Sequence, residues 1–260
     1  MGFPNLKGKH SRGALFSPGD FMAYLRRTGR YPRFEPPQGM ILCYQASLME
    51  YILKKHKTTR VNCFGGDTYL LDETGGRVGV AGKFGIGAPA AVTNLEELIA
   101  FGVKRFISVG TAGALRKGVN IGDIMVCDRA IRDEGTSYHY LKPSKYAYPS
   151  RELTDAIRAA LKAGGVEFFS GTTWTIDAPY RETVAEVKKY QREGVATVEM
   201  EASALFAAAR VRRVPIATMF TISDSLADLK WAPQFHHRRT SSGLEALYNA
   251  ALAVLRKGWR

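Results

Sequence analysis

The stretch Thr197–Phe206 constrains the fold most strongly, because it predicts a short buried strand that runs directly into a helix. β-branched residues begin it, and an alanine-rich run that favours helix follows Ala202. Two carboxylates, Glu199 and Glu201, stand at the junction. Open α/β sheets bind ligands outside the carboxyl ends of their strands, and a helix N-terminus stabilises a carboxylate. The junction therefore predicts an α/β protein in which these glutamates either bind a ligand or only favour the helix start.

The chain divides into an arm and one domain. Its 260 residues, 45% of them hydrophobic, suffice for a single large core. Residues 1–38 are rich in arginine, glycine and proline, which predicts a basic irregular arm with one short helix near Phe21–Arg27. Residues 39–260 contain no linker, so we expect one domain there.

Charge and cysteine content exclude several classes of protein. The net charge of +13 would suit nucleic acid or an anionic substrate, but no nucleic-acid-binding motif accompanies it, so a basic solvated surface is the favoured interpretation. Three scattered cysteines form no Cys-x-x-Cys pair, which argues against a disulfide framework or a metal site. No apolar run approaches the roughly 20 residues that span a bilayer, and no signal peptide is evident. We expect a soluble, cytoplasmic protein without a membrane partner.

Strand-like and helix-like segments alternate beyond the arm, which predicts a single three-layer α/β/α domain with a central mixed β-sheet. Strands are expected at Val61–Leu71, Arg77–Gly82, Lys104–Val109, Val166–Ile176 and Pro215–Ile222, with a strand pair within Asn120–Arg132. A brief apolar run, Met40–Tyr44, precedes the first of them. Helices are expected at Ser47–Lys55 with Ser47 as N-cap, Ala90–Phe101 ended by Gly102, Glu152–Ala163, Val184–Gln191 and Ser242–Arg256.

Three further strand ends carry glycine-rich or polar groups: Gly85-Ile86-Gly87, Gly110-Thr111-Ala112-Gly113 and Ser223-Asp224. A glycine-rich turn exposes backbone N–H groups that can hold an anion, although such turns also serve tight packing. Asp224 alone would be explained as a turn or N-cap residue. In this order and together with Val198-Glu199-Met200-Glu201-Ala202, the motifs resemble the nucleoside phosphorylase family, which includes purine nucleoside phosphorylases, uridine phosphorylases and methylthioadenosine nucleosidases. The resemblance extends from Met40 to the C-terminus.

The resemblance implies cleavage of a nucleoside N-glycosidic bond through an oxocarbenium-like transition state. Glu201 would accept hydrogen bonds from the ribose 2′- and 3′-hydroxyls, and Met200 would pack on the sugar. Asp224 would be the acid that donates a proton toward a departing purine. We also expect Arg238 or Arg239 to partner Asp224, from their approximate spacing.

The resemblance assigns the remaining site residues to three groups. Phosphate would contact Gly87, Thr111 and Arg60, the base would contact Ala112, Gly113, Tyr180, Arg181, Val198 and Ser223, and His10 would reach the 5′-hydroxyl from a neighbouring subunit. It implies phosphate as co-substrate with no cofactor or metal. It also implies a homo-oligomer, either a dimer or a hexamer built from dimers.

Two departures from the family concern phosphate. The family carries an arginine where this chain has Ser108, and a Gly-Asp-Pro-x-Arg turn where residues 44–49 contain no arginine. A guanidinium binds phosphate bidentately, so its loss weakens such a site.

The glutamine and arginine that bind uracil have no match within Thr183–Lys189, which favours a purine. Phosphorolysis is the first hypothesis, hydrolysis by water is the second, and a catalytically silent nucleoside-binding relative is the third.

Overall fold

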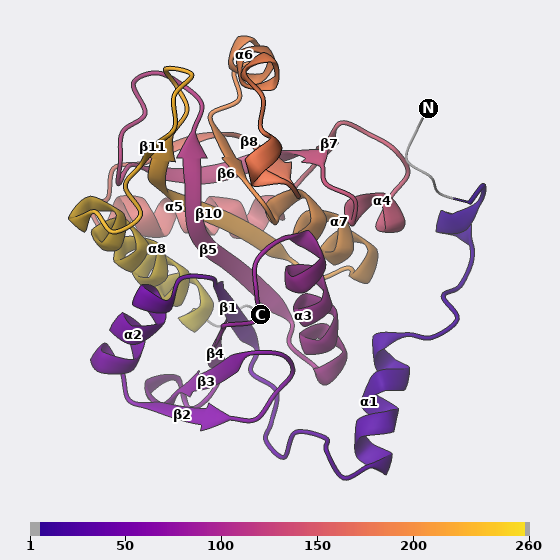
Figure 1. The fold of residues 1–260 in the computed structure, drawn as a ribbon. Helices are drawn as coiled ribbons and strands as arrows, with labels where there is room; N and C mark the ends of the chain where they lie inside the picture. Colours follow the sequence, from indigo (N-terminus) through magenta and orange to yellow (C-terminus); the bar gives the residue numbers. More distant parts are fainter. Residues whose placement is uncertain (1–5, 258–260) are drawn as a thin grey trace.

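The computed structural model describes residues 6–257, and its centre is a mixed β-sheet (Figure 1). Strands follow the order β11-β10-β6-β8-β9-β5-β1-β4-β3-β2, with β7 paired to β6 and β10 also paired to β5. The strands are β1 Gly39–Cys43, β2 Thr58–Val61, β3 Asp67–Leu71, β4 Val78–Gly82, β5 Arg105–Ala114, β6 Ile124–Asp133, β7 Tyr146–Ala147, β8 Phe169–Ile176, β9 Thr197–Glu199, β10 Ile216–Ser225 and β11 Ala232–Pro233. The helices are α1 Pro18–Arg27, α2 Ala46–Lys55, α3 Ala88–Phe101, α4 Ser137–Tyr140, α5 Arg151–Ala163, α6 Val184–Arg192, α7 Ala202–Arg212 and α8 Arg238–Arg256.

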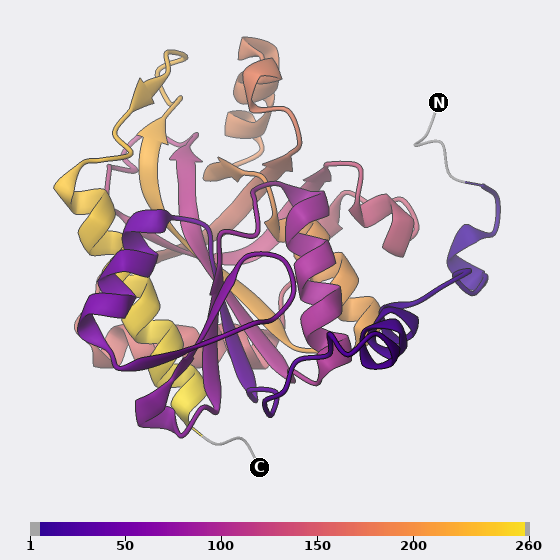
Figure 2. The same cartoon turned by 60° about the horizontal axis from the view of Figure 1, so that its bottom comes forward.

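Helices cover both faces of the sheet, which confirms the three-layer architecture (Figure 2). Alternate residues of β1 point to opposite faces, as the period of a strand requires. Ile41 and Cys43 pack with α2, α5 and α8, whereas Met40 and Leu42 pack with α3 and α7. Two apolar cores therefore hold the sheet between the helix layers.

Strand β5 pairs with three strands, whereas a strand within an open sheet pairs with two. It pairs in parallel with β1 and β10, and its end pairs antiparallel with β9 at Gly113 and Ala114. Since β10, β6, β8 and β9 are themselves paired in sequence, the sheet closes into a ring through β5. The prediction that this strand ends at Val109 is wrong, because β10 continues to pair with it through Gly110–Gly113.

Other boundaries differ for local reasons. The expected strand over Val61–Leu71 is two antiparallel strands, β2 and β3, and the left-handed Gly66 lies in the loop between them. One strand, β6, replaces the pair expected within Asn120–Arg132. Gln45 rather than Ser47 precedes α2, because Gln45 is the last residue with extended backbone. The structure confirms that Gly102 ends α3, and its φ of 133° suits glycine.

The arm packs against the domain at two places. Helix α1 begins at Pro18, earlier than predicted, because Ser17 and Asp20 form a capping box. Its Met22 is buried in the core that contains α3. The short 3-10 helix η1 (Lys9–Ser11) lies against α4. Residues 1–5 of the predicted arm and residues 258–260 of the predicted domain lie outside the described residues.

Within residues 6–257, no helix has both the length and the apolar character required to cross a membrane.

Gly243 is expected to be a site where a normally favourable helix substitution destabilises the protein. A Cβ atom there would overlap Thr221 Oγ1 and lie 2.7 Å from Thr221 Cβ, across the contact between α8 and β10. Gly→Ala in an open helix stabilises by about 0.5–1 kcal/mol, but overpacking costs about 1–3 kcal/mol. We therefore expect Gly243→Ala to lower the free energy of unfolding in urea. Ser242→Ala, at the exposed neighbouring position, is the control and should be neutral or slightly stabilising.

Candidate active site

A buried carboxylate, Glu199, joins the end of β9 to the start of α7. Its Oε2 accepts hydrogen bonds from the backbone N–H groups of Glu201 (2.8 Å) and Ala202 (2.7 Å). The Thr175 hydroxyl donates to Oε1 at 2.5 Å. Burial, followed by the negative charge of Glu201, raises the pKa of Glu199 to about 8. Of the two junction glutamates, Glu199 is thus the one that favours the helix start, because its oxygens are occupied by the protein.

Glu201 is the second junction carboxylate, and it lies at the edge of the site. It occupies the N-cap position of α7, and the Gly87 N–H donates to its Oε1 at 2.5 Å. A Cβ at Gly87 would lie 3.9 Å from Met200 Cε, so the three residues are neighbours. Burial raises the pKa of Glu201 to about 7. The Gly87 N–H, which is predicted to bind an anion, donates to this carboxylate in the structure.

Beside Glu201 lies a group of uncharged polar side chains, which we call the neutral corner: Tyr44, Gln45, Ser108 and Thr111. The Tyr44 and Ser108 hydroxyls are 3.1 Å apart, and Gln45 Nε2 donates to Thr111 Oγ1 at 3.1 Å. Burial, followed by the charge of Glu201, raises the pKa of Tyr44, which keeps its phenol neutral. Oxygen Oε1 of Gln45 is buried and has no hydrogen-bond partner within residues 6–257.

Sequence reasoning noticed the missing arginines at the neutral corner but not these contacts. Tyr44 and Ser108 are 64 positions apart, and neither forms a motif alone. The available signal was that Ser108 replaces one arginine of the family and that residues 44–49 contain no arginine either.

Asp224 forms the opposite end of the site. Strand β10 has an irregularity between Ile222 and Asp224, where its register on β5 shifts by one residue. Such a bulge re-aims side chains next to functional sites. The Ser223 hydroxyl donates to Asp224 Oδ1 at 2.8 Å, and the Trp231 indole N–H donates to Oδ2 at 3.0 Å. A Cβ at Gly113 would lie only 3.0 Å from Asp224 Oδ2, so glycine lets this carboxylate approach β5.

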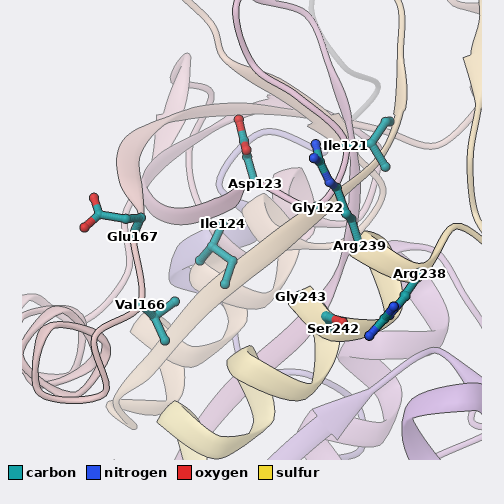
Figure 3. A pocket seen from close by; sticks show the side chains of 10 residues that line it. All are labelled: Ile121, Gly122, Asp123, Ile124, Val166, Glu167, Arg238, Arg239, Ser242 and Gly243. Atoms are coloured by element: carbon teal, nitrogen blue, oxygen red, sulfur yellow. The ribbon is translucent and has the colours of Figure 1, made fainter.

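The partner of Asp224 is thus Trp231, which the sequence analysis missed, and not Arg238 or Arg239. Both arginines line a separate cavity of about 580 Å³ at the start of α8, together with Asp123 and Glu167 (Figure 3). A tryptophan seven residues after Asp224, in the segment between the strand end and the last helix, was the available signal.

The structure brings most of the predicted site residues to one edge of the sheet. Thr111, Ala112 and Gly113 lie on β5, and Val198 pairs with Gly113 from β9. Tyr180 and Arg181 are exposed on the 3-10 helix η3 (Pro179–Arg181), between β8 and α6.

Two predicted residues lie elsewhere and are bound within their own chain. Arg60 on β2 forms an ion pair with Asp67 at 2.7 Å, and His10 Nε2 lies 2.9 Å from the Tyr138 carbonyl oxygen on α4. One subunit by itself therefore places neither side chain in the cluster around Glu201.

The positions of these residues agree with the match of the sequence to a known family. A sequence model of the phosphorylase superfamily matches residues 44–256, which is most of the chain. The chain belongs to the phosphorylase superfamily. Membership confirms the resemblance drawn from the four motifs, and the superfamily match includes both the Glu201 and the Asp224 ends of the site.

The individual relatives that the chain resembles are named as phosphorylases of different nucleosides. A uridine phosphorylase of Haemophilus influenzae is 33% identical over 136 residues, covering 47% of this chain and 54% of the relative. A guanosine phosphorylase of Halorubrum lacusprofundi is 32% identical over 142 residues, covering 55% and 59%. A DeoD-type purine nucleoside phosphorylase of Bacillus cytotoxicus is 33% identical over 174 residues, covering 64% and 73%. The chain thus spans little more than half the length of the first two.

A solved structure supports the superfamily fold. The purine nucleoside phosphorylase of Toxoplasma gondii, in complex with immucillin-H, superposes with a TM-score of 0.75 at 20% sequence identity. The match covers 85% of this chain and 91% of that one. It shows that the two chains share their fold.

Removal of the Glu199 carboxylate is expected to destabilise the protein without any substrate being involved. Glu199→Ala leaves the N–H groups of Glu201 and Ala202 and the Thr175 hydroxyl without their acceptor. We expect the free energy of unfolding in urea to fall by about 2–4 kcal/mol, the scale of a lost helix cap together with buried donors left without an acceptor. Glu50→Ala, which removes an exposed carboxylate from α2, is the control and should cost little. Equal stability of the two variants would contradict the anchoring role.

Proposed function

We propose that this protein cleaves the N-glycosidic bond of a purine nucleoside by phosphorolysis and releases the free base and ribose 1-phosphate. The observation that carries the proposal is the half-buried Glu201 carboxylate beside Met200 and Gly87, with Asp224 at the other end of the same strand edge. A carboxylate at the sugar and a second at the base suit a reaction that makes the ribose positive and the base negative.

In the proposed reaction, a phosphate oxygen attacks C1′ of the ribose while the C1′–N9 bond breaks. The electron pair of that bond moves to the purine, which takes up a proton from Asp224. Ionised Glu201 accepts the 2′- and 3′-hydroxyl hydrogen bonds and stabilises the positive ribose. Ser223 and Trp231 orient the Asp224 carboxyl group for its proton transfer.

The choice of purine and of phosphate draws on separate observations. The relatives named above are phosphorylases of uridine, guanosine and purine nucleosides, which supports phosphate as the nucleophile. Asp224 suits a leaving group that must be protonated, and the missing uracil-binding pair disfavours uridine. We further propose that the protein works as a homo-oligomer, because Arg60 and His10 can serve a site only from a neighbouring subunit.

Hydrolysis by water is the second candidate, and the neutral corner favours it. Each charged hydrogen bond that phosphate loses costs about 1.5–3 kcal/mol. The two missing arginines therefore weaken phosphate binding by roughly two to four powers of ten. The hydroxyls of Tyr44 and Ser108 and the free Oε1 of Gln45 can bind water without a cation.

Product analysis distinguishes the two candidates. We expect purine nucleosides incubated with the protein to release free base only when phosphate is added, with a high phosphate requirement, and to yield ribose 1-phosphate. The measurement is chromatography of base and sugar products with and without phosphate. Free ribose produced at the same rate without phosphate would establish the hydrolase instead. No base release in either condition would support a silent binding relative.

Turnover is expected to depend on the ionised form of Glu201. Since burial raises the pKa of Glu201 to about 7, kcat/KM should fall as the pH decreases below about 7 and the carboxylate takes up a proton. Glu201→Gln should lower kcat about 100- to 1,000-fold and abolish that acidic limb. Glu97→Gln, which removes a carboxylate of raised pKa from α3, is the control and should retain both. Normal turnover in Glu201→Gln would exclude Glu201 from the reaction.

A further inference from the structure

The folded arm presents aromatic rings and arginines side by side. On helix α1, the exposed rings of Phe21 and Tyr24 are stacked, with centroids 6.3 Å apart and planes inclined by 18°. The Arg27 guanidinium lies 5.9 Å from the centroid of Tyr24, and the Arg26 guanidinium lies 4.1 Å from that of Tyr31. The superfamily match does not include the arm, so these residues have no role assigned by it.

A cavity of about 440 Å³ lies where the arm joins the domain, close to the contact between α1 and α3 (Figure 2). Tyr31, Arg33 and Phe34 of the arm line it together with Phe101, the last residue of α3. The rings of Tyr31 and Phe34 meet the Phe101 ring edge-on, with centroids 5.7 and 5.0 Å away. A hollow of this size and lining suits a flat aromatic ligand such as a nucleobase.

The cations of the arm are not engaged by carboxylates. Residues 6–38 contain seven lysines and arginines but only two acids, so they supply five of the thirteen net positive charges. Within residues 6–257, none of the seven forms an ion pair with a carboxylate. One of the two acids, Asp20, is bound in the capping box of α1. An anionic ligand would therefore displace no ion pair when it binds here.

The charges and rings of the arm favour one kind of partner, single-stranded nucleic acid. A second copy of the chain carries the same net charge of +13, so the arm would approach a like-charged molecule. A membrane requires a free apolar helix face, whereas Met22 and Leu25 of α1 pack in the core that contains α3. A single strand supplies phosphate charges for the arginines and unstacked bases for the aromatic rings.

We propose that the arm binds single-stranded RNA or DNA. One base stacks on the exposed rings of Phe21 and Tyr24, another enters the cavity at the junction of arm and domain, and the arginines of the arm bind the phosphates. The sequence contains no nucleic-acid-binding motif, so only the folded arm brings these rings and cations together. The inference goes beyond the proposed nucleoside reaction and does not depend on it, because no aromatic residue of the arm takes part in that reaction.

The test measures the fluorescence anisotropy of a labelled single strand of about 12 nucleotides, made as RNA and as DNA, during titration with the full-length protein. The variants are Tyr24→Ala, Tyr24→Trp and Arg27→Gln, all at exposed positions. The matched controls are Tyr148→Ala and Arg151→Gln, which change an exposed tyrosine and an exposed arginine near the start of α5. A duplex of the same sequence and an excess of inosine are tested as competitors.

Wild type should bind the single strand more tightly than the duplex, and binding should weaken as salt increases from about 50 to about 200 mM. Tyr24→Ala should raise the Kd about 5- to 150-fold, whereas Tyr24→Trp should preserve it, because an aromatic face for stacking remains. Arg27→Gln should lower the slope of log Kd against log salt concentration by about 0.7, the share of one phosphate contact on a single strand. Both controls should bind as wild type does, and inosine should not displace the strand.

Four results would overturn the inference. The first is no binding of either strand by wild type up to about 100 µM protein at the lower salt concentration. The second is equal binding by wild type and Tyr24→Ala, which would leave only a basic solvated surface, and the third is displacement of the strand by inosine, which would place it in the nucleoside site. The fourth is another partner on the same surface in place of nucleic acid: either a smaller mass for Tyr24→Ala than for wild type by light scattering, or Tyr24-dependent binding to phosphatidylglycerol vesicles.

Discussion

The hydrogen bonds from the first amides of α7 to the buried Glu199 carboxylate determine where the rest of the site lies. They fix the direction in which the chain leaves β9, and so they place Glu201 and Met200 at the sheet edge. A helix start needs acceptors for its free N–H groups, and here a side chain from the preceding strand supplies one. The Glu201 carboxylate is thereby left at the edge of the site, although it still accepts one hydrogen bond from Gly87.

Strand β5 links the two ends of the site. It carries Ser108 and Thr111 of the neutral corner, and Gly113, a few residues further, leaves room for Asp224. Because β1, β9 and β10 all pair with this strand, its position is fixed from several sides. The Glu201 end and the Asp224 end of the site are therefore joined by one stretch of backbone whose position is fixed.

The fold class and the strand–helix junction at Glu199 could be predicted because their signals are local. Apolar periodicity, the alanine run after Ala202 and the glycine at residue 102 each act within a few residues. The contacts Tyr44–Ser108 and Trp231–Asp224 could not be predicted, because uncharged polar residues carry no spacing rule and meet only through the sheet topology. The sequence did not predict that β5 continues past Val109, because glycines usually weaken strands. Here the backbone of these glycines pairs with the neighbouring strand β10.

The packing of Tyr44 has a consequence for how such a site can change during evolution. Its ring lies against β5, where a Cβ at Gly110 would come within 3.1 Å of it, and its hydroxyl contacts Ser108. An arginine introduced at residue 108 alone would therefore meet an occupied position, and a charged group would be buried beside an aromatic ring. A gain of cationic character here requires residues 44 and 108 to change together. Single substitutions would therefore preserve the uncharged pair at residues 44 and 108, even where selection favoured the binding of an anion.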